Sequence, residues 1–200
     1  MTVDLWIVCG AIVLMGLPIA RFTIYQRRYR RIDDVVSFAR RLSIDDFERI
    51  TDPAEEWLLR RSMSTPEFKA LQRQRMQLCA EYLSRVAHNV EIIQGWSYRD
   101  HTIALSRIRN LGDEKTYLLW ELSRTATEVR IFALITRIKV ATWLLLRADL
   151  LPIRMIPQLD TIRTTAGFNL LTSYQTMTDL AKRVSYFYGP EWSDRMNGVL

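Results

Sequence analysis

Apolar residues follow three patterns along the chain, and each pattern predicts a helix of a different kind. Leu5–Ala20 is a run of sixteen residues without a charge. Pro66–Gln94 repeats its apolar residues with a period close to 3.6, which is typical of an amphipathic helix. Residues 131–146 are apolar almost all the way round a helix. Because seven glycines and six prolines are too few for the many turns of an all-β fold, we predict an all-α protein.

The first apolar run predicts a membrane-spanning helix. Sixteen residues of helix are about 24 Å long, which is short of the roughly 30 Å of a hydrocarbon core. The span is complete if the helix continues to Tyr25, and Trp6 and Tyr25 then lie at the two interfaces where aromatic residues are enriched. Arg21 would extend its charge toward the lipid headgroups. We therefore predict one transmembrane anchor over residues 1–25.

Positive charge after the run predicts the orientation of the anchor. The arginines that follow it are Arg21, Arg27, Arg28, Arg30 and Arg31, whereas the acid Asp4 precedes it. Because cytoplasmic flanks of membrane spans are rich in Lys and Arg, the amino terminus is predicted outside and the bulk of the chain in the cytoplasm, at the cell (inner) membrane. The predicted membrane-interface residues are Trp6, Arg21, Tyr25, Arg27, Arg28, Arg30 and Arg31, and residues 26–31 form a basic juxtamembrane segment.

Two other interpretations of the run stay open. A cleaved signal peptide would carry its positive charge before the run and a small-x-small site after it. The charges here have the reverse arrangement, and Pro18–Ala20 is a poor cleavage site. The second alternative is a buried hydrophobic helix of a soluble domain.

Residues 32–188 are predicted to form a helical bundle that begins with short helices. These cover 32–42, 44–50 and 53 to about 63, and they would pack as a collar beneath the membrane. Ser43 is a plausible cap for the second helix, and Asp52 followed by Pro53 is a strong start signal for the third.

Three long helices follow in the predicted bundle. The first runs from Pro66 to about Gln94, with a break or bend expected near Gly95–Asp100. A further segment would end at Gly112, and the second long helix covers 114 to about 147. The third covers about 158–188, and residues 189–200 are predicted to be a flexible tail.

The segment from Ile131 to Arg147 has two interpretations. A helix that is apolar all round belongs at the centre of a bundle. The segment also carries Arg137, Lys139 and Arg147 without an acid, so it could instead lie on the membrane surface. A second membrane span is unfavourable, because two cations would lie in the bilayer at about 2.5–3.5 kcal/mol each.

An uncharged polar stripe runs along the predicted last helix at helical spacing. Its members are Thr161, Thr165, Asn169, Thr172 and Thr176. The plain interpretation is a mildly polar helix surface whose hydroxyls bond to their own backbone. The stripe is also a possible contact face for another helix or subunit, or the polar wall of a ligand pocket.

Composition and charge narrow the class of protein. Six tryptophans and 48% hydrophobic residues are unlike a disordered chain. The net charge of +6 would suit a nucleic-acid binder, but the arginines at 21–31 contribute most of it and the remainder is nearly balanced. We therefore expect no nucleic-acid partner, and we expect the basic flank to attract anionic lipids by about 1 kcal/mol per cation.

The sequence offers no assembled catalytic or metal-binding motif. His88 and Glu91 share a helix face, but a di-iron bundle site needs four carboxylates and two Glu-x-x-His motifs. Three adjacent acid pairs each fall in the first turn of a predicted helix, where the macrodipole accounts for them. Cys9 and Cys79 would lie in the membrane and in the cytoplasm, so they cannot pair. No catalytic residue, cofactor or metal is predicted.

These observations favour a membrane-anchored cytoplasmic helical protein without catalysis of its own. It would act as an interaction, scaffold or regulatory module that contacts lipid through the anchor and binds another protein or itself. The alternative is a membrane-associated enzyme, or a binder of an apolar small molecule or lipid, with a closed pocket between the long helices.

Overall fold

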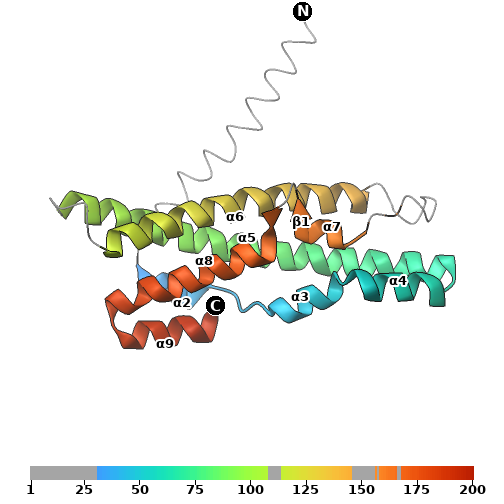
Figure 1. Ribbon diagram of the computed structural model, residues 1–200, viewed down its shortest axis with the longest axis horizontal. Coiled ribbons are helices and arrows are strands. Elements are labelled where there is room, and N and C mark those ends of the chain that lie inside the picture. Colours follow the sequence, from blue (N-terminus) through green and yellow to red (C-terminus); the bar gives the residue numbers. More distant parts are fainter. Residues whose placement is uncertain (1–30, 108–113, 146–155, 157, 166–167) are drawn as a thin grey trace, which may run out of the picture.

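A computed structural model describes residues 31–107, 114–145, 156, 158–165 and 168–200 (Figure 1). These residues are mostly α-helical and form a helical bundle, which confirms the all-α prediction. The predicted anchor and Gly112 lie outside the described residues. Within the described ranges, no helix combines the length and the apolarity that crossing a membrane requires.

Two long helices form the axis of the molecule. α5 (Thr65–Arg107) and α6 (Glu114–Leu145) lie side by side and share the largest interface between elements in the described part of the chain (Figure 1). α8 (Leu170–Ser185) packs against α6. The largest fully buried side chains are Trp96, Tyr174, Phe47, Phe68, Met76, Leu83, Ile92, Ile93, Leu119, Leu122, Leu159 and Ile162.

Three short helices precede α5 in the sequence and lie along it, on the side away from α6 (Figure 1). They are α2 (Ile32–Phe38), α3 (Ile44–Ile50) and α4 (Pro53–Ser62). The bounds of α3 and α4 agree with the prediction, whereas α2 ends four residues before the predicted end at 42. Both predicted caps are confirmed: Ser43 Oγ accepts the Asp46 N–H at 3.3 Å, and the Asp52 carboxylate accepts the Ala54 N–H at 3.0 Å. Each cap satisfies a backbone donor that the first helical turn leaves unpaired.

The predicted break near Gly95–Asp100 is wrong, because α5 continues through it to Arg107. Trp96 is fully buried, and its indole N–H donates to the Asp100 carboxylate at 2.9 Å. A glycine inside a helix costs about 1 kcal/mol relative to alanine. Burying the neighbouring indole and the adjacent Ile92 and Ile93 outweighs that cost.

The predicted helix over 158–188 is wrong in its first third. α7 (Asp160–Arg163) is one turn long, and β1 (Thr164–Thr165) pairs antiparallel with β2 (Phe168–Asn169) before α8 begins. Asn169 caps α8, because its side-chain oxygen accepts the N–H groups of Leu171 and Thr172 at 3.1 and 3.4 Å. The residue that looked like part of a stripe is therefore a helix start.

The carboxy-terminal residues form a helix where a flexible tail was predicted. The 3₁₀ turn η2 (Tyr186–Tyr188) ends at Gly189, whose φ of 122° favours glycine. α9 (Pro190–Val199) follows and packs against α8 and α2. Met196 in α9 is fully buried, so this helix belongs to the bundle.

Candidate binding surface on the outer face of α6

Five large aliphatic side chains lie exposed along one face of α6. We name them the α6 outer strip: Ile131, Leu134, Ile135, Ile138 and Leu145. Between 42% and 82% of each residue is accessible to solvent. Ile131, Leu134, Ile135 and Ile138 are three or four residues apart, so they adjoin on the helix surface and form a continuous row. Leu145 lies two turns further along the same face, beyond the exposed Thr142.

The opposite face of the same helix segment is buried. Ala133, Thr136 and Val140 are fully or almost fully enclosed. The interpretation that placed this segment at the bundle centre is therefore wrong for its outer half, because α5 and α8 pack against one side only (Figure 1). The exposed aliphatic face is what the membrane-surface interpretation expected. Arg147, the end of the predicted segment, lies outside the described residues.

The charged residues around the strip are basic, and two of the three form hydrogen bonds with other elements of the bundle. No acidic residue occurs from Val129 to Leu145. Arg130 donates to the side-chain oxygen of Gln94 at 2.9 Å, and Lys139 donates to the Thr161 carbonyl at 2.8 Å. Arg137 is exposed, three residues after Leu134. The strip thus has a cation at its edge and no carboxylate within it.

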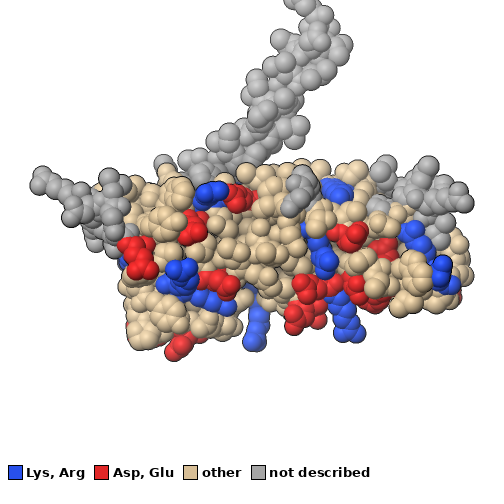
Figure 2. Space-filling view, viewed as in Figure 1, with Lys and Arg blue, Asp and Glu red and all other residues tan. Residues whose placement is uncertain are grey.

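Aromatic residues extend the exposed face toward the start of α6. Tyr117 and Trp120 are both about half exposed, with ring centroids 6.3 Å apart. Arg124 lies over the Trp120 ring at 5.9 Å and forms an ion pair with Glu128 at 3.1 Å. From the start of α6 toward its end, the outer face therefore carries two aromatic residues, then the ion pair of Arg124 and Glu128, and then the aliphatic strip. Figure 2 shows uncharged atoms over much of the edge where α6 runs, and acidic clusters lower down over α3.

The polar stripe predicted from Thr161 to Thr176 does not exist as one helix face. Thr161 lies in α7, Thr165 in β1, and Asn169 caps α8, so only Thr172 and Thr176 share a helix. The hydroxyl of Thr161 donates to the Gln158 carbonyl at 2.7 Å, and that of Thr176 donates to the Thr172 carbonyl at 2.9 Å. These bonds agree with the plain interpretation of hydroxyls bonded to their local backbone.

Of the predicted membrane-interface residues, only Arg31 is described. It precedes α2, and its backbone N–H donates to the Asp34 carboxylate at 3.1 Å. Trp6, Arg21, Tyr25, Arg27, Arg28 and Arg30 lie outside the described residues.

The titratable groups considered as ligands have structural partners. A ring nitrogen of His88 lies 3.0 Å from the Phe38 carbonyl, and Glu91 lies 3.9 Å from the Arg130 guanidinium. In the described part of the chain, no three His, Cys, Asp or Glu side chains gather as a metal site requires. Burial raises the pKa of the Cys79 thiol to about 12, so this thiol stays protonated at neutral pH.

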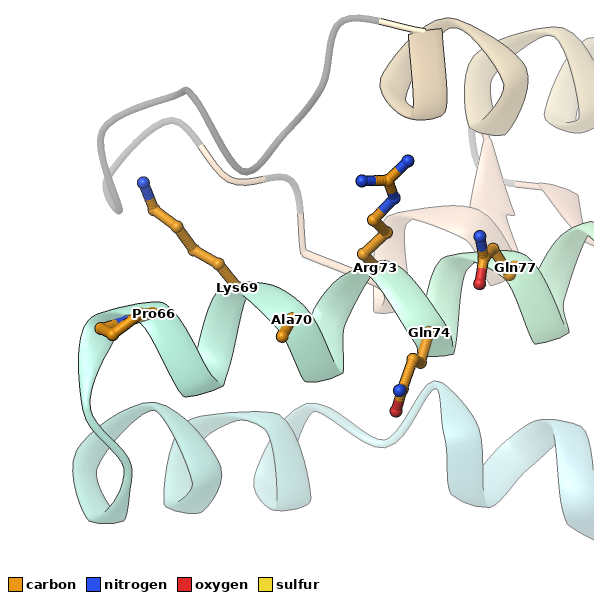
Figure 3. A pocket seen from close by; sticks show the side chains of 6 residues that line it. All are labelled: Pro66, Lys69, Ala70, Arg73, Gln74 and Gln77. Carbon is orange, nitrogen blue, oxygen red and sulfur yellow. The ribbon is translucent and has the colours of Figure 1, made fainter.

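An open depression of about 490 Å³ lies along the first turns of α5. Figure 3 shows its lining residues on this one helix, with Lys69 and Arg73 on one side and Gln74 on the other. The remaining lining residues are Pro66, Ala70 and Gln77. The alternative function requires a closed apolar pocket between the long helices, whereas this depression is open and its lining residues all belong to α5.

Sequence reasoning missed a polar cluster that joins three elements. The Asp100 carboxylate in α5 accepts hydrogen bonds from Trp96 and from the Tyr188 hydroxyl in η2. Lys115 at the start of α6 lies 3.9 Å from the centre of the Tyr188 ring. Burial is the main cause that raises the pKa of Tyr188. Trp96 and Asp100 are one helical turn apart, but Tyr188 and Lys115 lie far from them in the sequence, so no local pattern could have revealed the whole cluster.

The described residues define an all-α bundle whose most distinctive surface feature is the α6 outer strip. Comparison of the chain with family models, curated proteins and solved structures found no match.

Proposed function

We propose that the chain is a membrane-tethered helical module that acts by binding, with the α6 outer strip as its contact surface. The observation that carries the proposal is the strip itself. Scattered exposed aliphatic residues are ordinary, whereas four of these lie in one row that the exposed Tyr117 and Trp120 extend toward the start of α6, and larger apolar patches of this kind mark interaction sites. Covering such a row with another apolar surface stabilises the complex by about 25 cal/mol for each Å² removed from water.

The tether rests on the sequence of the first 31 residues. A run of sixteen uncharged residues followed by five arginines favours insertion with the bundle on the cytoplasmic side. The bundle begins at Ile32, directly after the basic segment, so it would lie close to the membrane surface.

The proposal assigns binding and no catalysis, because the described polar clusters have structural partners. Asn89 joins the backbone of Arg40 to the Tyr174 hydroxyl, and Glu56 accepts the backbone N–H of Leu159. Gln94 links Thr127 to Arg130. Each cluster joins segments that are distant in the sequence, which is what stabilising a fold requires.

Membrane flotation of the full chain tests the tether. We expect the wild-type chain to float with the membranes in a density gradient after alkaline carbonate treatment, whereas aggregates would sink. Val13→Arg places a cation in the centre of the predicted span, at a cost of about 2.5–3.5 kcal/mol, and should abolish flotation. Val13→Leu is the matched control and should float. Recovery of the wild-type chain in the carbonate supernatant would contradict the tether.

Cysteine labelling tests the predicted side of the membrane. In the Cys9→Ala chain, Asn197→Cys introduces a thiol at an exposed position of α9. A membrane-impermeant maleimide should label it only after the cells are permeabilised. Labelling in intact cells would reverse the predicted orientation while leaving the tether in place.

A further inference from the structure

We propose that the occupant of the α6 outer strip is the lipid bilayer itself, so that the bundle lies against the membrane with α6 along its surface. This inference rests on the proposed function, because the tether brings the strip to the lipid. It names the partner of the surface, and the partner is an anionic bilayer.

The size of the strip favours lipid over a protein partner. From Ile131 to Leu145 the helix advances about 21 Å, and a single helix face is about 10 Å wide, which gives on the order of 200 Å². A stable protein–protein interface covers roughly 800 Å² on each partner. The strip alone is therefore too small to hold a second copy of the chain or another protein from solution.

A tethered surface needs far less area. Only residues 26–31 separate the predicted anchor from α2. At about 3.5 Å per extended residue, this linker reaches at most about 20 Å. A short linker holds the bundle at a millimolar effective concentration relative to the membrane, so weak contacts suffice.

Charge also favours an anionic bilayer. The segment from Val129 to Leu145 has no carboxylate that lipid headgroups would repel, and the exposed Arg137 lies beside the strip. Each cation near such a surface contributes about 1 kcal/mol. The exposed face of α8 offers a contrast, because it carries Thr172, Gln175, Thr176 and Asp179 and has no aliphatic row.

The arrangement of the helices permits the contact. α6 runs along one edge of the bundle, and α2, α3 and α4 lie beyond α5 on the other side (Figure 1). The elements with the most contacts to α6 in the described chain are α5 and α8, and neither covers the strip residues, which remain exposed. Amphipathic helices bury their apolar face about 5–10 Å into the boundary between headgroups and acyl chains.

Site-specific fluorescence in nanodiscs tests the contact. The full chain with Cys9→Ala is reconstituted, one copy per disc, in phosphatidylcholine and phosphatidylglycerol. Ile138→Cys is labelled with the fluorophore NBD, and Thr176→Cys on α8 is the matched control. Because both positions are exposed, neither substitution should disturb the fold, and circular dichroism checks this. Parent protein without either cysteine shows that the buried Cys79 stays unlabelled.

We expect the label at position 138 to be quenched by doxyl lipids and shielded severalfold from aqueous iodide. The label at position 176 should show the reverse. Discs without phosphatidylglycerol, or the variant Arg137→Gln, should reduce the lipid quenching.

Several outcomes would overturn the inference. Equal iodide access at positions 138 and 176 would show that the strip faces water. Shielding from iodide in single-copy discs without quenching by doxyl lipids would show that another segment of the chain covers it. A disulfide between two copies of Ile138→Cys in larger discs, without lipid quenching, would assign the strip to a dimer. If iodide reaches the label at position 138 in discs but not in cells, the strip would be covered by a protein partner.

The flotation experiment distinguishes failure of the tether from failure of the lipid contact. A chain that floats while its strip stays in water refutes only the lipid contact. For a chain that does not float, the same labels are read with added vesicles of the same lipids. Lipid quenching there would support the strip as a lipid surface without the tether, and its absence would refute both.

Discussion

Among the described residues, two charged side chains are buried, and each forms a hydrogen bond with a backbone group of another segment. Arg75 interrupts the apolar face of α5, and its guanidinium donates to the Ile50 carbonyl at 3.0 and 2.6 Å, which caps the end of α3. Glu56 belongs to an acidic pair that the macrodipole explained, yet its carboxylate accepts the Leu159 N–H at 2.9 Å across the bundle. The residue types and their spacing predicted the start of α4, but they could not predict the contact between Glu56 and Leu159.

The Glu56 contact gives a stability prediction. Glu56→Ala leaves a buried N–H group without an acceptor, so we expect the free energy of unfolding to fall by about 1–3 kcal/mol. Glu56→Gln keeps a side-chain oxygen at a similar position and should lose clearly less. Urea unfolding of the detergent-solubilised chain, followed by circular dichroism, measures both. Equal stability of Glu56→Ala and the wild type would refute the role.

The buried thiol of Cys79 gives a pH prediction. Burial raises its pKa from 9.0 to about 12, so the folded chain holds this proton more tightly than the unfolded chain does. The associated stability is fully present below pH 9 and is lost as the pH rises from 9 toward 12.

The measurement is the difference in melting temperature between the wild type and Cys79→Ala. Burial also raises the pKa of Tyr82, Tyr174 and Tyr188, so these tyrosines ionise first in the unfolded chain and add to the loss of stability. The melting temperature of Cys79→Ala is therefore subtracted from that of the wild type at each pH. We expect the wild type to lose stability more steeply above pH 9. A difference that does not change with pH would show that the thiol is not shielded as described.

At the scale of elements, local sequence signals were sufficient to predict where a helix begins when a capping residue marks its start. Ser43 and Asp52 fixed the starts of α3 and α4. Periodicity was insufficient where a short hairpin continues a helical spacing, as in the pair β1 and β2. It also could not say which side of the apolar segment 131–146 would be covered, because that depends on how many helices pack against α6.

The start of α8 gives a prediction for an element. Asn169→Ala removes the acceptor for two backbone N–H groups and should destabilise the chain by about 0.5–2 kcal/mol. Asn169→Asp retains a capping oxygen and should remain close to the wild type. Urea unfolding midpoints of the two variants separate these cases. Equal losses in both would mean that the cap oxygen does not account for the helix start.

At the scale of the whole molecule, α9 joins the two ends of the described chain. It contacts α2, the first described helix, as well as α8. A polar composition suggested a loose tail, but Pro190 at the first helical position and the spacing of Trp192, Met196 and Val199 are signals of an amphipathic helix. The position of α2 bears on the proposed function, because α2 follows the predicted anchor in the sequence.

Truncating Met196 should therefore weaken the whole bundle. The side chain is fully buried, so Met196→Ala should lower the free energy of unfolding by about 2–5 kcal/mol. Asn197→Ala, next to it on the exposed side, should stay within about 0.5 kcal/mol of the wild type. A chain ending at Gly189 should lose at least as much as Met196→Ala, and proteolysis should then cut first near α2. If that truncated chain unfolds like the wild type, α9 is not part of the cooperative core, and the link between α9 and the start of the bundle is refuted.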